Sequence, residues 1–260
     1  NITNDADKNK FSINKNWITG VYTKTQYYLN ILGCSKSFYD LITNEKVIKI
    51  CESYMGNSFR LKATRYYETH PNHKMYWHSD NKNEKEFKNI KGLIFIAYLE
   101  DVNEGEFQYI KKSHKFSAVG KKNYFTDDDI NEKYKDDIIS FKGFRGDMII
   151  CHTYGIHRAV PIKKESKFVR KSLFFQVDSD LKNSEPILIN TSFLKTRDEK
   201  LLTYLGLGYS SVNKIYPNTS FFTLPPSKII NILFIKYLLK SMLDQFIKLI
   251  PKKIKKIILD

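Results

Sequence analysis

Apolar residues change their spacing along the chain, and the change separates an N-terminal region from a central one. Between residues 17 and 55 they recur every three or four positions, which predicts amphipathic helices that end at Gly56 and Asn57. From about residue 58 the pattern changes to short apolar or alternating runs separated by turn residues, which predicts strands. These runs are residues 59–67, 75–80, 93–99, 105–110, 147–152, 158–161 and 168–177.

Many short strands joined by turns are typical of a sandwich, a barrel or a jelly roll. We therefore expect a mainly β fold with flanking helices. Residues 1–225 should form one domain, with a helical N-terminal part, a β core at about 58–180 and a short helix around 193–205. Ser227, a good N-cap residue, then begins a basic amphipathic helix in a second segment, residues 226–260.

The composition is that of a folded protein. Of the 260 residues 42% are hydrophobic and 14% aromatic, which excludes a disordered chain. The three cysteines (Cys34, Cys51 and Cys151) lie far apart, which argues against a disulfide scaffold or a cysteine zinc site and fits a reducing compartment. No apolar signal-peptide region is visible, and no stretch offers the ~20 apolar residues of a membrane span. We expect a cytoplasmic protein.

The net charge of +15 is a weak guide to partners, because abundant Lys, Asn and Ile with scarce Ala is also the bias of an AT-rich coding sequence. Residues 228–260 are different: eight lysines against two aspartates give a local charge of +6. The helix expected there packs on the core, forms a dimer, or lies on an anionic membrane surface, which its lysines favour. In the last case the protein would be peripheral at the inner face of a membrane.

The strongest local motif is Trp77-His78-Ser79-Asp80. Residues i and i+2 of a strand share a face, so an imidazole and a carboxylate can point towards one metal ion. A histidine from another strand would complete the two-histidine, one-carboxylate triad of non-haem Fe(II) oxygenases. Alone, the motif is weak, since a surface strand residue beside an aspartate gives the same pattern.

The downstream sequence offers the missing parts of such a site. His157 follows the strand that begins at Asp147, and Arg170 lies inside an apolar strand. Buried arginines are rare unless paired, and the guanidinium fork suits a carboxylate such as that of 2-oxoglutarate. Ser172 shares a face with Arg170 and could donate a hydroxyl to the same carboxylate.

These motifs occur in an order that resembles the phytanoyl-CoA dioxygenase family. The resemblance implies a double-stranded β-helix core (jelly-roll or cupin-like), Fe(II) held by His78, Asp80 and His157, and 2-oxoglutarate held by Arg170, with dioxygen as the oxidant. Asp80 favours hydroxylation, because halogenating members replace this carboxylate with a small residue. One departure is Lys111-Lys112, where the family commonly has Pro-Gly. The matching stretches, within 60–177, are RYYETHPNHKMYWHSD, YLEDVNEGEFQYIKKSHKFS, RGDMIICHTYGIHRAVP and FVRKSLFFQV.

Other residues compete for roles in the site. His152 is an alternative third ligand, but its odd spacing from His157 would turn it to the opposite face of an unbroken strand. A zinc cluster of His70, His73 and His78 lacks the usual cysteines, so two loop histidines near the pocket mouth are the simpler interpretation. His114 is either an outer neighbour of the metal site or a solvated residue. Thr64, or its neighbour Arg65, could reach the cosubstrate.

The sequence therefore predicts an Fe(II)- and 2-oxoglutarate-dependent dioxygenase that hydroxylates a small-molecule, lipid-linked or glycan-type substrate. One alternative is a basic protein that binds membrane or nucleic acid without catalysis, for which the lysines would matter and His78 would not. Another is an oxygenase acting on nucleic acid, which no arginine-aromatic platform in the sequence favours.

Overall fold

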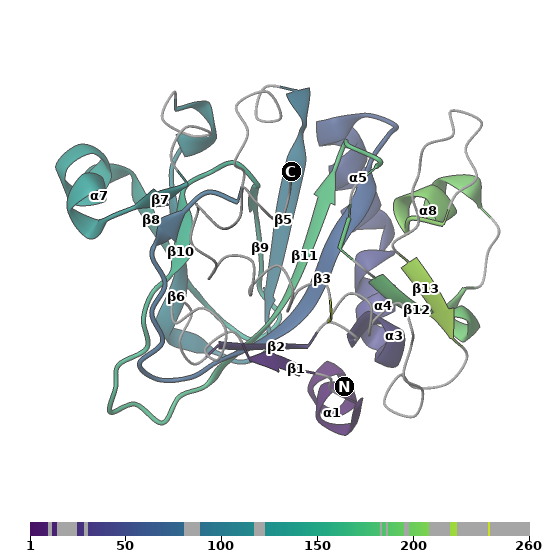
Figure 1. Cartoon of the computed structure of the whole chain (residues 1–260), viewed down its shortest axis with the longest axis horizontal. Coiled ribbons are helices and arrows are strands. Elements are labelled where there is room, and N and C mark those ends of the chain that lie inside the picture. Colours follow the sequence, from purple (N-terminus) through teal and green to yellow (C-terminus); the bar gives the residue numbers. More distant parts are fainter. Residues whose placement is uncertain are drawn as a thin grey trace, which may run out of the picture.

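In the computed structural model two antiparallel sheets form the centre of the molecule, and helices cover the larger one (Figure 1). The structure describes residues 1–9, 12–14, 25–28, 31–80, 89–116, 123–182, 184–185, 187–194, 198–207, 219–222 and 239. The larger sheet has the order β1-β2-β3-β11-β5-β9, and the smaller one β7-β4-β10-β6-β8. This is the jelly-roll core with flanking helices that the sequence predicts.

The strands and helices have the following bounds. The larger sheet comprises β1 (Ser12–Asn14), β2 (Thr25–Tyr28), β3 (Arg60–Thr69), β5 (Gly92–Tyr98), β9 (Met148–His152) and β11 (Arg170–Asp178). The smaller comprises β4 (Trp77–His78), β6 (Val102–Ile110), β7 (Tyr124–Phe125), β8 (Ile138–Gly143) and β10 (His157–Ala159). The helices are α1 (Ile2–Asn9), α3 (Ile31–Cys34), α4 (Lys36–Ile42), α5 (Glu45–Met55), α7 (Asp127–Tyr134) and α8 (Glu199–Tyr204).

Part of the expected helical region is a strand. Residues 25–28 form β2, which pairs with the edge of β3 through Thr25↔Thr69 to Tyr28↔Tyr66. Threonine and tyrosine favour strands, and an exposed edge supplies the unpaired backbone groups that such a segment can bond. The predicted stop after α5 is confirmed, since Gly56 caps it at φ 84° and donates to the carbonyl of Glu52.

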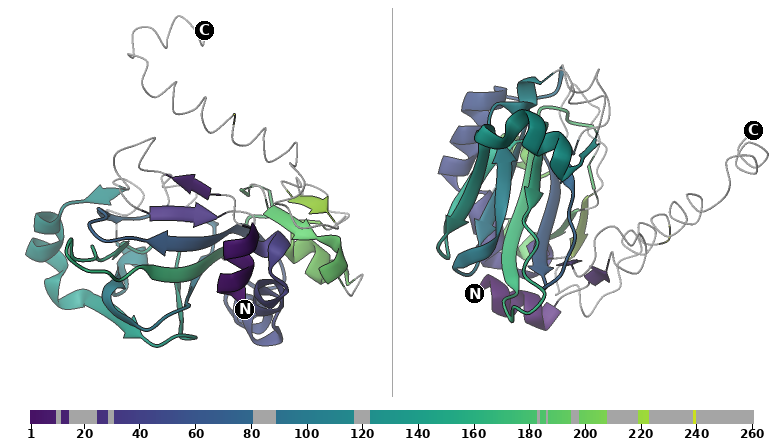
Figure 2. Two further views of the ribbon diagram at one scale, coloured as in Figure 1. Left: turned by 90° about the horizontal axis from the view of Figure 1, so that it is seen from below. Right: turned by 90° about the vertical axis from the view of Figure 1, so that its left-hand side faces the viewer.

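The region after the β core is also more regular than expected. Beside α8 it contains a parallel pair of strands, β12 (Ile187–Asn190) and β13 (Thr219–Phe222). Figures 1 and 2 show α8 and α7 at opposite ends of the molecule. The helix predicted for residues 226–260 lies outside the described residues, Leu239 excepted. Among the helices that the structure describes, none is long and apolar enough to cross a membrane.

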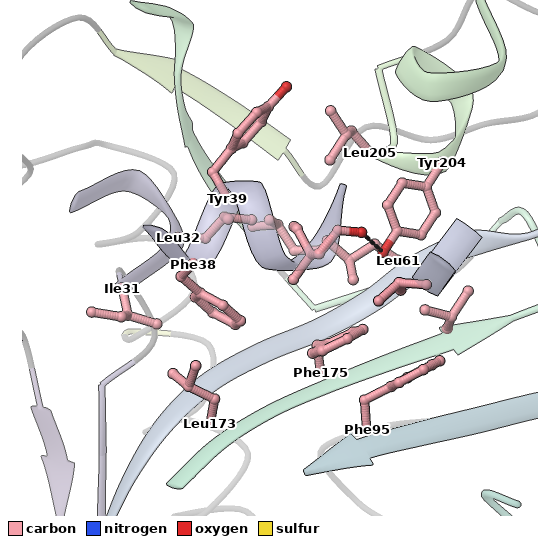
Figure 3. Close-up of a cluster of buried hydrophobic side chains, with 14 of the residues drawn as sticks. Ile31, Leu32, Phe38, Tyr39, Leu61, Phe95, Leu173, Phe175, Tyr204 and Leu205 are labelled. Atoms are coloured by element: carbon pink, nitrogen blue, oxygen red, sulfur yellow. Dashed lines mark hydrogen bonds between the residues drawn. The ribbon is translucent and has the colours of Figure 1, made fainter. Parts of the chain in front are cut away.

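The alternating faces of β11 divide the main core from the interior between the sheets. Leu173, Phe175 and Val177 point towards the helices, where Phe175 stacks on Phe95 at 4.5 Å and meets the edge of Phe38 at 6.3 Å (Figure 3). The intervening residues, from Arg170 onwards, point between the sheets. The helices and their aromatic core therefore hold β11 in place while its other face lines the interior.

Replacing Phe175 with alanine should lower the free energy of unfolding by about 3–5 kcal/mol, because a fully buried ring is lost and its cavity cannot close completely. Urea denaturation measures the change. Phe144→Ala is the matched control: Phe144 is 73% exposed, so the loss of its ring should cost less than about 0.5 kcal/mol. Equal effects of the two substitutions would contradict this placement of the core.

Candidate metal centre

His78, Asp80 and His157 come together between the two sheets. Their ligand atoms all lie within 4.8 Å of one another, the only such group of three that we find among the residues described. His78 Nε2 is 3.6 Å from one carboxylate oxygen of Asp80, and His157 Nε2 is 3.8 Å from the other. Two imidazoles and one carboxylate in this arrangement suit a divalent transition metal and leave further coordination positions open.

Strand pairing places the two histidines. β4 and β10 are antiparallel neighbours, and His78 lies directly opposite His157. β4 ends at His78, but the chain keeps the direction of the strand for two more residues because two hydrogen bonds fix Ser79. Its N–H donates to the carbonyl of Asn123 at 3.0 Å, and its hydroxyl donates to that of Tyr154 at 3.2 Å. Asp80 thus returns to the face that carries His78.

Both histidines are oriented in the same way by the main chain. Nδ1 of His78 is 2.9 Å from the carbonyl oxygen of Tyr76, and Nδ1 of His157 is 2.9 Å from that of Gly155. A carbonyl oxygen can only accept, so each Nδ1 must carry the proton. The basic nitrogen is therefore Nε2, which faces Asp80 in both residues. Such a hydrogen bond selects the tautomer and ring orientation that a metal ligand needs.

The other histidines lie away from this centre. His152 stacks on His114, with ring centroids 4.7 Å apart, and its Nδ1 accepts the N–H of Tyr154. Burial, followed by the charge of His114, lowers the pKa of His152 to about 4. His73 is buried, its Nδ1 accepts from the N–H of Ile162, and burial lowers its pKa to about 4. Neither His70 nor His73 joins His78 in a group able to hold a metal in the described part of the chain.

Arg170 lines the same pocket as the three candidate ligands and is 7% exposed. Its guanidinium donates to the carbonyl of Gly105 and, at 3.1 Å, to the hydroxyl of Thr69, while its Nε has no hydrogen-bond partner. No described carboxylate lies within 4 Å of it. Burial lowers the pKa of this guanidinium, which reflects the cost of a charge held away from water. A buried, incompletely satisfied cation in a pocket is suited to an anionic ligand.

Two further residues were predicted to contact the cosubstrate, Ser172 and Thr64. Ser172 is buried and lines the pocket two residues after Arg170 on β11, on the same face. Thr64 does not line it. The β3 residues in the wall are Arg65, Tyr67 and Thr69, so Thr64, one position out of phase, points to the opposite face of the sheet. Arg65, rather than Thr64, is thus the residue of this pair that lines the pocket, and a contact of either with a cosubstrate stays a prediction.

Sequence reasoning missed most of the apolar wall. Strand alternation could have identified residues of β5 and β11 as a set, but not which of the two alternating sets faces the metal. The complete lining is Arg65, Tyr67, Thr69, Met75, His78, Asp80, Ile94, Ile96, Tyr98, Phe107, His157, Ala159, Arg170, Ser172 and Phe174.

Comparison with known proteins shows a shared fold. No family model matches the sequence, and no curated protein matches it either. HygX from Streptomyces hygroscopicus, with nickel, 2-oxoglutarate and hygromycin B bound, superposes with a TM-score of 0.56 at 11% identity, over 70% of this chain and 78% of HygX. SnoN, a non-heme α-ketoglutarate-dependent epimerase from nogalamycin biosynthesis, gives a TM-score of 0.50 at 16% identity, over 69% of each chain. The jelly-roll fold is thus that of known 2-oxoglutarate-dependent enzymes.

Alanine in place of His78, Asp80 or His157 should abolish stoichiometric binding of Co(II), because each substitution removes one of three donors. Isothermal titration calorimetry measures the binding. His152→Ala is the control, since His152 lies outside the pocket and should be dispensable for the metal. The third ligand would be wrongly assigned if His157→Ala still bound Co(II) while His152→Ala, at unchanged thermal stability, did not.

Proposed function

We propose that this protein is an Fe(II)- and 2-oxoglutarate-dependent dioxygenase that hydroxylates a small-molecule substrate. One observation carries the proposal: the two-histidine, one-carboxylate group and a buried arginine without a carboxylate partner among the described residues line a single pocket. The residues fit Fe(II), since both imidazoles present Nε2 to the same point as the carboxylate. They also fit a dicarboxylate that reaches from the metal to Arg170.

Each residue then has a definite task. Bound iron, with 2-oxoglutarate and dioxygen, supplies the oxidising chemistry. His78, Asp80 and His157 hold the metal at one side of the pocket. The guanidinium of Arg170 pairs with the carboxylate remote from the metal, and the hydroxyl of Ser172 donates to it. Thr69 and Gly105 already hold two donors of Arg170, so the remaining guanidinium atoms are oriented before the ligand binds.

Substrate would occupy the rest of the pocket, where Ile94, Ile96 and Phe174 provide apolar contact and Arg65 a polar group. HygX, crystallised with hygromycin B, supports a small-molecule substrate for this fold. SnoN, an epimerase, shows that the fold also serves outcomes other than hydroxylation. Asp80 and the order of motifs favour hydroxylation of the phytanoyl-CoA dioxygenase type for this chain.

Arg170→Met tests the cosubstrate assignment. It should raise the KM for 2-oxoglutarate about 10- to 100-fold, the loss expected for charge-assisted hydrogen bonds worth about 1.5–3 kcal/mol. It should leave thermal stability equal or higher, because methionine fills much of the same volume without a buried charge. Succinate release at varied 2-oxoglutarate measures KM. The KM of Arg170→Lys should lie between those of the wild type and Arg170→Met, since lysine keeps the charge but loses the planar guanidinium fork.

The whole proposal depends on the metal ligands. His78→Ala or Asp80→Ala should abolish succinate formation while circular dichroism shows an unchanged fold. Removing iron from the wild-type protein with a chelator should have the same effect, and adding Fe(II) should restore activity. Succinate formation that persists in both variants would refute His78 and Asp80 as the metal ligands. A wild-type protein that forms no succinate with Fe(II) would instead make the non-catalytic binding protein the better explanation.

A further inference from the structure

The residues next to the two histidine ligands form a cluster on the outer face of the smaller sheet. Trp77 precedes His78 on β4, and Arg158 follows His157 on β10. Neighbours on a strand point to opposite faces, so these two side chains lie behind the metal centre. Neither lines the metal pocket; both line a separate cavity together with Asp127, the first residue of α7. Figure 1 shows α7 on the side of the smaller sheet.

One carboxylate oxygen joins all three residues. The indole Nε1 of Trp77 donates to Oδ1 of Asp127 at 3.0 Å, and the Nη1 of Arg158 donates to the same oxygen. The guanidinium also lies over the indole, with its central carbon 4.4 Å from the ring centroid, in a cation–π contact. Nε of Arg158 donates to the side-chain carbonyl of Gln108 on β6. The clamp of Trp77, Arg158 and Asp127 therefore ties β4 to β10 and α7.

The main chain alone connects these strands weakly. β4 has two residues, and its pairing with β10 consists of the single pair His78↔His157. On its other side β4 pairs with β7, itself only two residues long, so backbone pairing does little to stop β4 from sliding or tilting. Trp77 is 1% exposed and packs with Phe125 and Ile130, so its ring is fixed. A fixed indole that is also bound to Arg158 limits how far His78 can move relative to His157.

We infer that Trp77, Arg158 and Asp127 are positioning residues that set the spacing of His78 and His157, and thereby the affinity and geometry of the metal site. The inference rests on the proposed metal centre and adds to it. Metal ligands must be held within about 0.5 Å and 10–20° of the productive geometry by the residues around them. The clamp acts through the backbone of the residues adjacent to the ligands, on the side away from the pocket.

Asp127 offers a clean test because its side chain is 66% exposed, so its replacement should leave the fold intact. Asp127→Ala should weaken Co(II) binding about tenfold, the lower end of the effects seen for outer-shell partners of metal ligands. It should also change the d–d absorption spectrum of bound Co(II), which reports ligand geometry. Asp127→Asn keeps an acceptor oxygen for both donors and should recover most of the affinity and the wild-type spectrum.

Asp128→Ala is the matched control. Asp128 lies in the same first turn of α7, so its removal has the same effect on the charge at the helix N-terminus. It should leave Co(II) affinity and spectrum unchanged. Trp77→Phe provides a second variant, since it keeps an aromatic ring beneath Arg158 but removes the indole N–H; it should alter the spectrum in the same direction as Asp127→Ala.

The outcomes separate cleanly. Wild-type affinity and spectrum in Asp127→Ala would overturn the positioning role, whatever its thermal stability. Equal weakening by Asp127→Ala and Asp128→Ala would also overturn it, because the effect would then come from the helix terminus. A wild-type protein that binds no Co(II) would refute the proposed metal centre itself, a result distinct from either of these.

Discussion

The candidate site depends on one contact between strands, the pair that places His78 opposite His157. Strand residues alternate between faces, so a slip of a single residue would turn one histidine out of the pocket and bring Trp77 or Arg158 into it. The alternation makes such a slip costly, because Trp77 would leave an apolar cluster and Arg158 would lose the carboxylate of Asp127. The register is therefore specified by the outer face as much as by the inner one.

On the opposite sheet, the two faces of β11 also differ in the residues that they bury. Its inner face holds the buried guanidinium of Arg170, which is unfavourable in the absence of an anion. Its outer face carries Leu173, Phe175 and Val177, all fully buried against the helices. Because the two sets of residues share one backbone, the apolar packing on one side offsets the desolvation on the other. The apolar anchoring of β11 thus helps to keep in the interior an arginine that is suited to a ligand.

Periodicity was sufficient to predict the β core, the pairing of His78 with Asp80 on one face, and the shared face of Arg170 and Ser172. Periodicity was insufficient where pairing with a distant strand determines whether a segment is a strand or which of its faces points inwards. β2 forms because the edge of β3 is available to it, which a local pattern cannot reveal. The choice between Thr64 and Arg65 depends on which alternating set of β3 faces inwards. A bulge opposite Gln176 and Val177, between Leu61 and Ala63, shifts the phase at the start of the same strand.

The charges of the pocket link the two ligands that we propose. Among the groups that line it, Asp80 carries a negative charge and Arg65 and Arg170 carry positive charges, but Arg65 is paired with Glu185, and a histidine that binds metal through Nε2 is neutral. A divalent cation alone would leave a net positive interior, and a dianion alone a net negative one, both disfavoured away from water. Metal and 2-oxoglutarate together restore the balance, so each should bind more tightly in the presence of the other. By linkage, the metal must raise the affinity for 2-oxoglutarate by the same factor as 2-oxoglutarate raises the affinity for the metal. A weakened clamp behind His78 should therefore reduce the affinity for 2-oxoglutarate only when metal is present.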